Sequence, residues 1–155
     1  MGLRRAGLLH DLKRSAKVVL DTSILIYHLE DVRPYSDLTE GALTALAEGS
    51  FAGLVSTISL AELLVKPFRE GRNEQITRCE RFVLSLPNTT LCAPDHVISR
   101  EAARLRAKYL LKTADALLVA TALVEKAAAL LTNDHGLRKV QVEGFEVLLL
   151  SEYVR

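Results

Sequence analysis

The chain has 155 residues, of which 49% are hydrophobic and 25% are charged, with a formal net charge of +1. This ordinary composition excludes a disordered or fibrous protein and fits one globular domain with a core of its own. The net charge is close to zero and therefore gives no information about nucleic-acid binding, so such a function must be inferred from particular residues.

Residues 1–16 form a basic N-terminal extension in our interpretation, with Asp11 as its one acidic residue. We expect a surface helix or a mobile tail there, followed by a single domain at residues 17–155. The longest uncharged apolar segment, at residues 116–124, is far shorter than the roughly 20 residues that span a membrane. No secretory signal is visible, so we expect a cytoplasmic protein without membrane association. Cys79 and Cys92 lack the spacing of a metal site.

Short apolar segments alternate with longer amphipathic segments along the rest of the chain. We expect strands at residues 17–21, 53–58, 89–92, 128–131 and 145–149. The expected helices are at residues 22–29, 36–47, 59–68, 73–86, 94–110 and 113–126. The last of them is apolar on nearly all sides and should be the most buried. This alternation predicts an α/β fold: a three-layer α/β/α domain with a five-stranded, mainly parallel central sheet.

Four acidic residues stand close to the carboxyl ends of the expected strands. Asp21 ends the first strand, and Asp134 follows the fourth by a few residues. Glu62 and Asp115 lie in the first turns of the helices expected to start at residues 59 and 113. Because open parallel sheets bind ligands at this edge, we expect the four side chains to meet there.

Each acid also has a purely structural explanation. Residues 59–62 have the spacing of a capping box, and Asp115 suits the positive end of a helix dipole. Asp21 could cap the helix that follows it, and Asp134 before Gly136 is ordinary turn chemistry. Both explanations stay open for each residue, but capping alone gives no reason for all four to converge on one edge.

Convergence of the acids has an energetic consequence. Two carboxylates about 4 Å apart repel by roughly 4 kcal/mol at an effective dielectric of about 20. A cluster of this kind either takes up protons or holds a cation, and oxygen ligands without Cys or His favour Mg²⁺ or Mn²⁺. A bound cation lowers the pKa of water and neutralises a phosphate, which suits hydrolysis of a phosphodiester.

The segments around the four acids resemble the motifs of PIN-domain nucleases. Residues 18–23, with the sequence VVLDTS, resemble the opening motif, in which a hydrophobic strand is followed by Asp-Thr-Ser. Residues 58–63 resemble the second motif, residues 113–122 the third and residues 131–134 the last. The resemblance covers residues 17–150, with all the acids in order.

This resemblance implies a Mg²⁺- or Mn²⁺-dependent endoribonuclease, similar to the VapC toxins of type II toxin–antitoxin pairs. It further implies an RNA substrate, a small antitoxin protein as a partner, and a homodimer. Carried over by position, the catalytic and metal-binding residues are Asp21, Glu62, Asp115 and Asp134. Ser23 and Thr132 would support them, although both residue types also favour caps and turns.

Two lysines are candidate contacts to RNA phosphates. Lys66 and Lys112 are each close in sequence to one of the acids. The basic residues at positions 100, 104 and 108 share one helix face, but such stripes usually face water. We interpret His135 as a solvated turn residue.

Other functions remain open. A PIN-domain nuclease could act in RNA processing or decay without an antitoxin, and a PIN-like domain could serve interaction alone, although such a relative should have lost an acid. A haloacid-dehalogenase-type phosphatase needs a second acid after the first strand, where this chain has Thr22 and Ser23. A receiver domain needs paired acids there and a Lys after the last strand, where this chain has Leu149 and Leu150.

Overall fold

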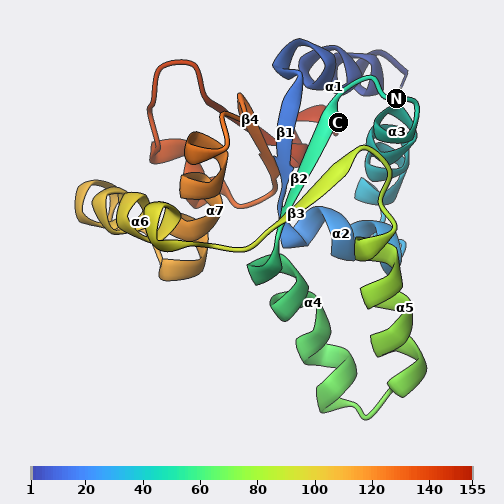
Figure 1. The fold of residues 1–155 in the computed structure, drawn as a ribbon. Helices are drawn as coiled ribbons and strands as arrows, with labels where there is room; N and C mark the ends of the chain where they lie inside the picture. Colours follow the sequence, from blue (N-terminus) through green and yellow to red (C-terminus); the bar gives the residue numbers. More distant parts are fainter. Residues whose placement is uncertain (1, 155) are drawn as a thin grey trace.

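The computed structural model describes residues 2–154, with side chains from residue 4 onward. A five-stranded sheet forms its centre (Figure 1), and the strands are β1 (Lys17–Leu20), β2 (Ala52–Ser56), β3 (Thr89–Cys92), β4 (Ala129–Thr132) and β5 (Glu146–Leu149). Neighbouring strands all pair in parallel, in the order β3-β2-β1-β4-β5. The predicted five-stranded, mainly parallel sheet is confirmed, and the sheet is parallel throughout.

The order of the strands reverses at β1. The chain builds outward from β1 through β2 and β3, and then returns to place β4 on the other side of β1. Leu20 of β1 is in register with Leu131 of β4, so the residues that follow these two strands meet at one edge. The carboxyl ends of β1 and β4 therefore flank the switch point at which open α/β sheets bind ligands.

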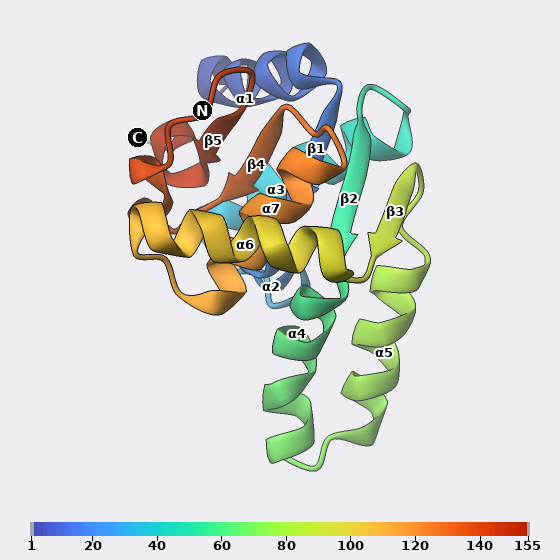
Figure 2. The ribbon, with the colours of Figure 1, turned by 60° about the vertical axis from the view of Figure 1, so that its left-hand side comes forward.

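Helices cover both faces of the sheet (Figure 2). The first face carries α1 (Gly2–Ser15), α2 (Thr22–Leu29), α3 (Tyr35–Ala47), α4 (Thr57–Arg69) and α5 (Asn73–Leu84). The second face carries α6 (His96–Tyr109) and α7 (Thr113–Val124). The 3-10 helices η1 (His135–Lys139) and η2 (Leu150–Tyr153) flank β5. This is the predicted three-layer arrangement.

The central strands contribute to a core on each face. Val18 and Leu20 pack with the helices of the first face, whereas Val19 packs with those of the second. All three side chains are fully buried, as expected for a parallel strand between two helical layers. Helix α7 buries Ala116, Val119 and their neighbours, which agrees with the prediction from its apolar sequence.

The start of α4 differs from the sequence prediction. We expected Ser59 to be the N-cap in a capping box, but Ser56 is the N-cap, and its Oγ accepts a hydrogen bond from Ile58 N at 3.1 Å. β2 therefore ends earlier, and the β-branched Thr57 and Ile58 lie in the helix although such residues favour strands. Ser59 is buried inside the helix, and among the described residues its Oγ has no hydrogen-bond partner.

Helices α4 and α5 run side by side and extend away from the sheet (Figure 1). Pro67 lies inside α4, which continues to Arg69, one residue beyond the predicted end of this helix. Proline has no N–H to donate to the carbonyl four residues earlier, so α4 continues past Pro67 with one backbone hydrogen bond fewer. We refer to α4, α5 and the turn between them as the helical hairpin.

Helix α1 packs against the same core as the sheet. Leu8 and Leu12 are fully buried in the cluster on the first face. The Tyr153 hydroxyl donates a hydrogen bond to Asp11 at 2.6 Å, which joins α1 to η2. The basic segment is thus a helix with one buried face, and the domain boundary at residue 17 stays a prediction. Within residues 2–154, we find no helix with both the length and the apolar character to cross a bilayer.

Candidate active site

Asp21 is the most deeply placed acid of the candidate site, one residue beyond β1. It is the N-cap of α2, and its Oδ1 accepts a hydrogen bond from Thr22 N at 2.7 Å. Its Oδ2 accepts hydrogen bonds from Thr132 Oγ1 at 2.5 Å and from Ser23 Oγ at 3.4 Å. The residue is only 9% exposed, so these donors replace the water that a surface carboxylate would bind.

The turn after β4 brings a second acid to the same edge. Thr132 is fully buried, and its Oγ1 accepts a hydrogen bond from Asp134 N at 3.1 Å while it donates to Asp21. Asp134 is exposed, and its Oδ1 accepts a hydrogen bond from Gly136 N at 2.9 Å. The Thr132 hydroxyl therefore bridges the first acid and the backbone of the second.

Glu62 reaches the site from α4. Its Oε1 accepts a hydrogen bond from Thr22 Oγ1 at 3.0 Å, so the residue next to Asp21 holds this carboxylate. We expected Glu62 in the first turn of its helix, but the earlier start of α4 places it in the second turn. Its side chain is exposed and still faces α2 through this contact.

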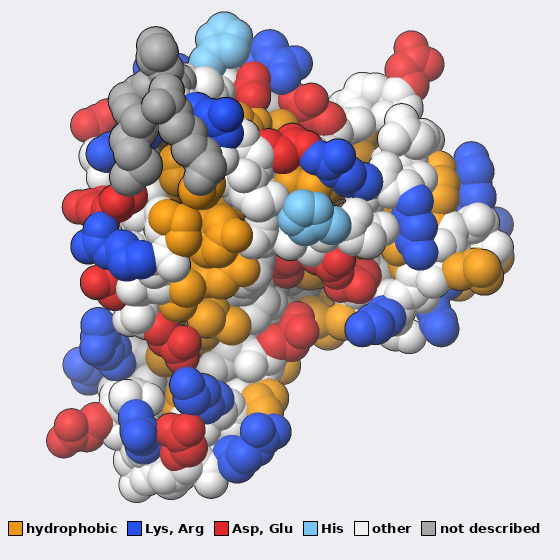
Figure 3. All heavy atoms as spheres, turned by 180° about the vertical axis from the view of Figure 1, so that it is seen from behind, with side chains coloured by type: hydrophobic (Ala, Val, Ile, Leu, Met, Phe, Trp, Pro, Cys, Tyr) orange, Lys and Arg blue, Asp and Glu red, His pale blue; other side chains and the backbone are white. Residues whose placement is uncertain are grey.

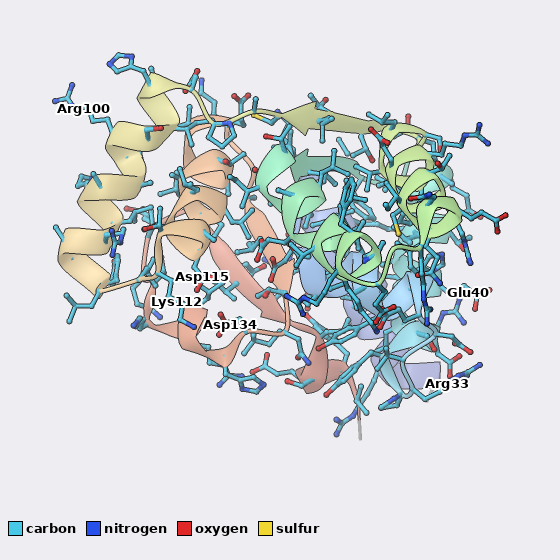
Figure 4. All side chains as sticks on the ribbon, turned by 90° about the horizontal axis from the view of Figure 1, so that it is seen from below. Arg33, Glu40, Arg100, Lys112, Asp115 and Asp134 are labelled. Carbon is cyan, nitrogen blue, oxygen red and sulfur yellow. The ribbon has the colours of Figure 1, made fainter. Side chains whose placement is uncertain are left out.

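Asp115 lies in the first turn of α7, and Lys112 is the N-cap residue of that helix. Figure 4 views the molecule from below, and in this view Lys112, Asp115 and Asp134 lie near one another. Acidic side chains also gather in the recess between the helical hairpin and the α6–α7 layer in Figure 3. The four predicted acids thus come from separate segments of the chain and lie at the edge formed by the carboxyl ends of the strands.

The surroundings of Asp21 and Asp115 raise the pKa of both carboxyl groups. Burial is the main cause that raises the pKa of Asp21, and the negative charges of Glu62 and Asp134 raise it further. The pKa of Asp115 is raised first by burial and then by the charges of Asp134 and Asp21, whereas Lys112 lowers it. We refer to Asp21, Glu62, Asp115 and Asp134 as the acidic cluster.

The cluster has the chemistry of a site for a hard divalent cation. Its ligand atoms are carboxylate oxygens, and a cation would neutralise the charge that burial and repulsion oppose at Asp21 and Asp115. Within residues 2–154, no three Asp, Glu, His or Cys side chains already converge closely enough to hold an ion. Mg²⁺ usually keeps several water ligands and needs only one or two carboxylates, so the residues present fit such an ion.

The sequence analysis did not assign two polar residues that help to arrange the candidate site, Thr22 and Asn133. Thr22 holds Glu62, and a hydroxyl directly after an acid was a visible signal for such a contact. Asn133 Nδ2 donates to the Tyr27 hydroxyl at 3.2 Å, and Asn133 Oδ1 accepts from Ser151 N at 2.9 Å. These bonds tie the turn that carries Asp134 to α2 and η2, and no local pattern could have indicated them.

The basic residues considered as phosphate contacts lie in different places. Lys112 adjoins Asp115 at the acidic cluster. Lys66 lies one turn beyond Glu62 on α4, with its Nζ 3.4 Å from Glu30 Oε1. Arg100, from the basic stripe of α6, lies at the periphery in Figure 4, away from Asp115.

Replacement of Thr132 by Val tests the bridge between Asp21 and the turn after β4. Valine keeps the shape of threonine but removes the hydroxyl, so the buried carboxylate loses its shortest hydrogen bond. We expect the free energy of unfolding to fall by about 1–3 kcal/mol in urea denaturation. Thr132→Ser keeps the hydroxyl and should retain most of that stability. An unchanged urea midpoint in the valine variant would show that the bridge is dispensable.

Comparison with known proteins places this geometry in a family. The PIN domain model matches residues 18–143. A toxin–antitoxin complex from Klebsiella pneumoniae contains a chain that is 25% identical, with a TM-score of 0.63, covering 86% of this chain and 97% of that one. VapBC2 from Rickettsia felis, bound to a promoter DNA fragment, is 20% identical, with a TM-score of 0.67 and coverage of 84% and 96%. DNA-bound VapBC from Salmonella typhimurium is 14% identical, with a TM-score of 0.63 and coverage of 86% and 98%. No curated protein sequence matches the chain.

The family match includes all four acids and most of the chain. The observed strand order also differs from the 2-1-3-4-5 order of flavodoxin-like receiver domains, which removes one alternative. The resemblance inferred from the motifs is confirmed. The chain belongs to the PIN domain family, a family of nucleases.

Proposed function

We propose that the protein is an endoribonuclease that hydrolyses RNA in the cytoplasm with the help of Mg²⁺ or Mn²⁺. The observation that carries this proposal is the convergence of the acids at the switch point of a PIN-domain sheet, where Thr22 holds Glu62 and Thr132 links Asp21 to the backbone of Asp134. Asp21 is buried among hydrogen-bond donors, and the charges of Glu62 and Asp134 act directly on it. A cluster of this charge is well suited to a divalent cation.

The residues of the cluster have different tasks in this proposal. Asp21 would be the fixed ligand, because Thr132 and the backbone of α2 hold both of its oxygens. Glu62 would be oriented by Thr22, and the more accessible Asp134 and Asp115 would complete the set. When bound, the cation neutralises the phosphodiester and makes hydroxide available near neutral pH.

Lys112 would bind the RNA backbone beside this cluster. Its ammonium group is close enough to lower the pKa of Asp115, so a phosphate over the acids would lie within its reach. Contacts to phosphate give affinity and orientation without a choice of sequence. Lys112 therefore positions the strand for cleavage.

Removal of divalent metal is expected to abolish RNA cleavage, and Mn²⁺ or Mg²⁺ to restore it. A labelled oligoribonucleotide in EDTA and in added metal measures this directly. Thermal unfolding gives an independent readout, because Mn²⁺ at 100 times its Kd adds about 2.7 kcal/mol to the free energy of unfolding. This stabilisation should disappear in Asp21→Asn and persist in Glu48→Gln, which removes a charge from the exposed end of α3. Full activity in EDTA would refute the proposal.

We further infer that the protein has an antitoxin partner and forms a homodimer. Each of the three solved structures described above is a toxin–antitoxin complex, and two of them are bound to DNA. Co-expression with a short reading frame next to the gene should give a stable complex in which RNA cleavage is inhibited. Sedimentation equilibrium of the isolated chain tests the dimer. A genome without such a neighbouring frame would favour a role in RNA processing.

A further inference from the structure

A cavity lies between the helical hairpin and α2, directly beside the acidic cluster. Its volume is about 410 Å³, which lies in the range of small-molecule pockets. Glu62 is part of its wall and is also the residue that Thr22 holds in the acidic cluster. Glu62 therefore belongs both to the cavity wall and to the acidic cluster.

One part of the cavity wall is apolar. Ile26 and Leu29 from α2, Leu63 and Pro67 from α4, and Cys79 from α5 all line it. Such a surface can contact the face of a planar ring. None of the described residues that line the cavity is aromatic, so contact with a ring would involve aliphatic groups and guanidinium planes.

The rest of the wall is charged or polar, with three basic residues set against Glu30, Glu62 and Gln75. Lys66, Arg72 and Arg78 line the cavity, and several Lys and Arg side chains are visible on the hairpin in Figure 3. Lys66 is paired with Glu30 at 3.4 Å, and Arg72 with Glu70 at 3.0 Å. Arg78 makes no ion pair within 4.0 Å to any residue that the structure describes. The cavity thus offers a cation beside an apolar surface.

We propose that this cavity binds the nucleotide that flanks the cleaved bond of a single-stranded RNA. This proposal rests on the proposed function: Glu62 belongs both to the acidic cluster and to the cavity wall, so a strand over the acids that continues past Glu62 enters the cavity. There the apolar wall would receive the base and Arg78 would receive the adjacent phosphate. A base and a phosphate together match this combination of surfaces better than either an uncharged ring or a simple anion.

The natural cysteines allow a direct test that needs no cleavage. Cys79 lines the cavity and packs against the first core, whereas Cys92 packs against the second core. Both thiols are free and half-buried, and burial raises the pKa of each, so they form a matched pair. Alkylation by iodoacetamide is measured for Cys79 in Cys92→Ser and for Cys92 in Cys79→Ser, with Mn²⁺ present and with Asp115→Asn added to both variants to prevent cleavage.

A mixed-sequence oligoribonucleotide should slow alkylation of Cys79 in proportion to its occupancy and leave Cys92 unaffected. Inorganic polyphosphate at equal phosphate concentration should protect much less. Equal protection by polyphosphate would overturn the recognition of a nucleotide and leave a phosphate site. A cavity that receives a side chain of a protein partner would show no protection by RNA, and that result would overturn the proposal entirely.

Kinetics supply the second test. Arg78→Gln should raise the KM for RNA about 3- to 10-fold with little change in kcat, because the contact is to a phosphate away from the reacting bond. Arg100→Gln removes an equal charge from the periphery and should leave KM unchanged. An equal KM in both variants would overturn the subsite. If the wild-type protein cleaved no RNA, the proposed nuclease function would fail, while the alkylation result would still decide whether the cavity binds a nucleotide.

Discussion

Asp115→Asn is expected to abolish RNA cleavage in a protein that remains folded. The Asp115 carboxyl is half-buried, and its pKa is raised by burial and by the charges of Asp134 and Asp21. Asparagine has the same shape but removes one charged oxygen ligand from the cluster. Loss of a single group that stabilises developing charge commonly lowers kcat by about 10²- to 10³-fold.

The free energy of unfolding of Asp115→Asn shows whether the loss of cleavage is due to misfolding. Because the substitution removes one negative charge from a set of repelling carboxylates, the metal-free free energy of unfolding should be unchanged or higher. Single-turnover cleavage in Mn²⁺ and thermal unfolding in EDTA measure the two quantities. Glu48→Gln is the matched control and should retain the wild-type cleavage rate. Near-wild-type cleavage by Asp115→Asn would remove this residue from the proposed machinery.

Leu12→Ala should destabilise the whole domain, although it lies in the basic N-terminal segment. The Leu12 side chain is fully buried in the core of the first face. Truncation of a buried leucine leaves a cavity and typically costs about 2–5 kcal/mol. Urea denaturation followed by circular dichroism should show a lower midpoint in a single transition.

Lys13→Ala is the control for the helix itself. Lys13 is the exposed neighbour of Leu12, and its replacement should change stability by less than about 0.5 kcal/mol. If Leu12→Ala had equally little effect, α1 would be an appendage rather than part of the cooperative unit. A large effect would instead mean that α1 belongs to the cooperative unit.

Much of the architecture could be predicted because each layer has a distinct periodicity. The apolar strand that ends at Leu20 and the Ala-rich helix after Lys112 were recognised with nearly correct bounds. The start of α4 was placed too late because Thr57 and Ile58 favour strands, and only the contact of Ser56 with the backbone ends β2 before them. The role of Leu12 was missed because the basic residues around it suggested a solvated segment.

The acids of the site could be predicted because they follow strands or begin helices at one edge. Their surroundings could not. Thr132 was assigned a supporting role, but its bridge between Asp21 and the backbone of Asp134 depends on the pairing of β1 with β4. Pairing between segments so far apart is a tertiary property, and a single sequence without its relatives contains no local pattern for it.

The bridge between Thr132 and Asp21 also has a consequence for biosynthesis. The two residues are separated by 111 positions, so Asp21 is synthesised long before Thr132. At about 5–20 residues per second, translation of the intervening chain takes roughly 6–22 s. Throughout that interval the nascent polypeptide lacks the strand that completes the pocket. The site at the carboxyl ends of β1 and β4 therefore cannot assemble until the segment of β4 has been synthesised.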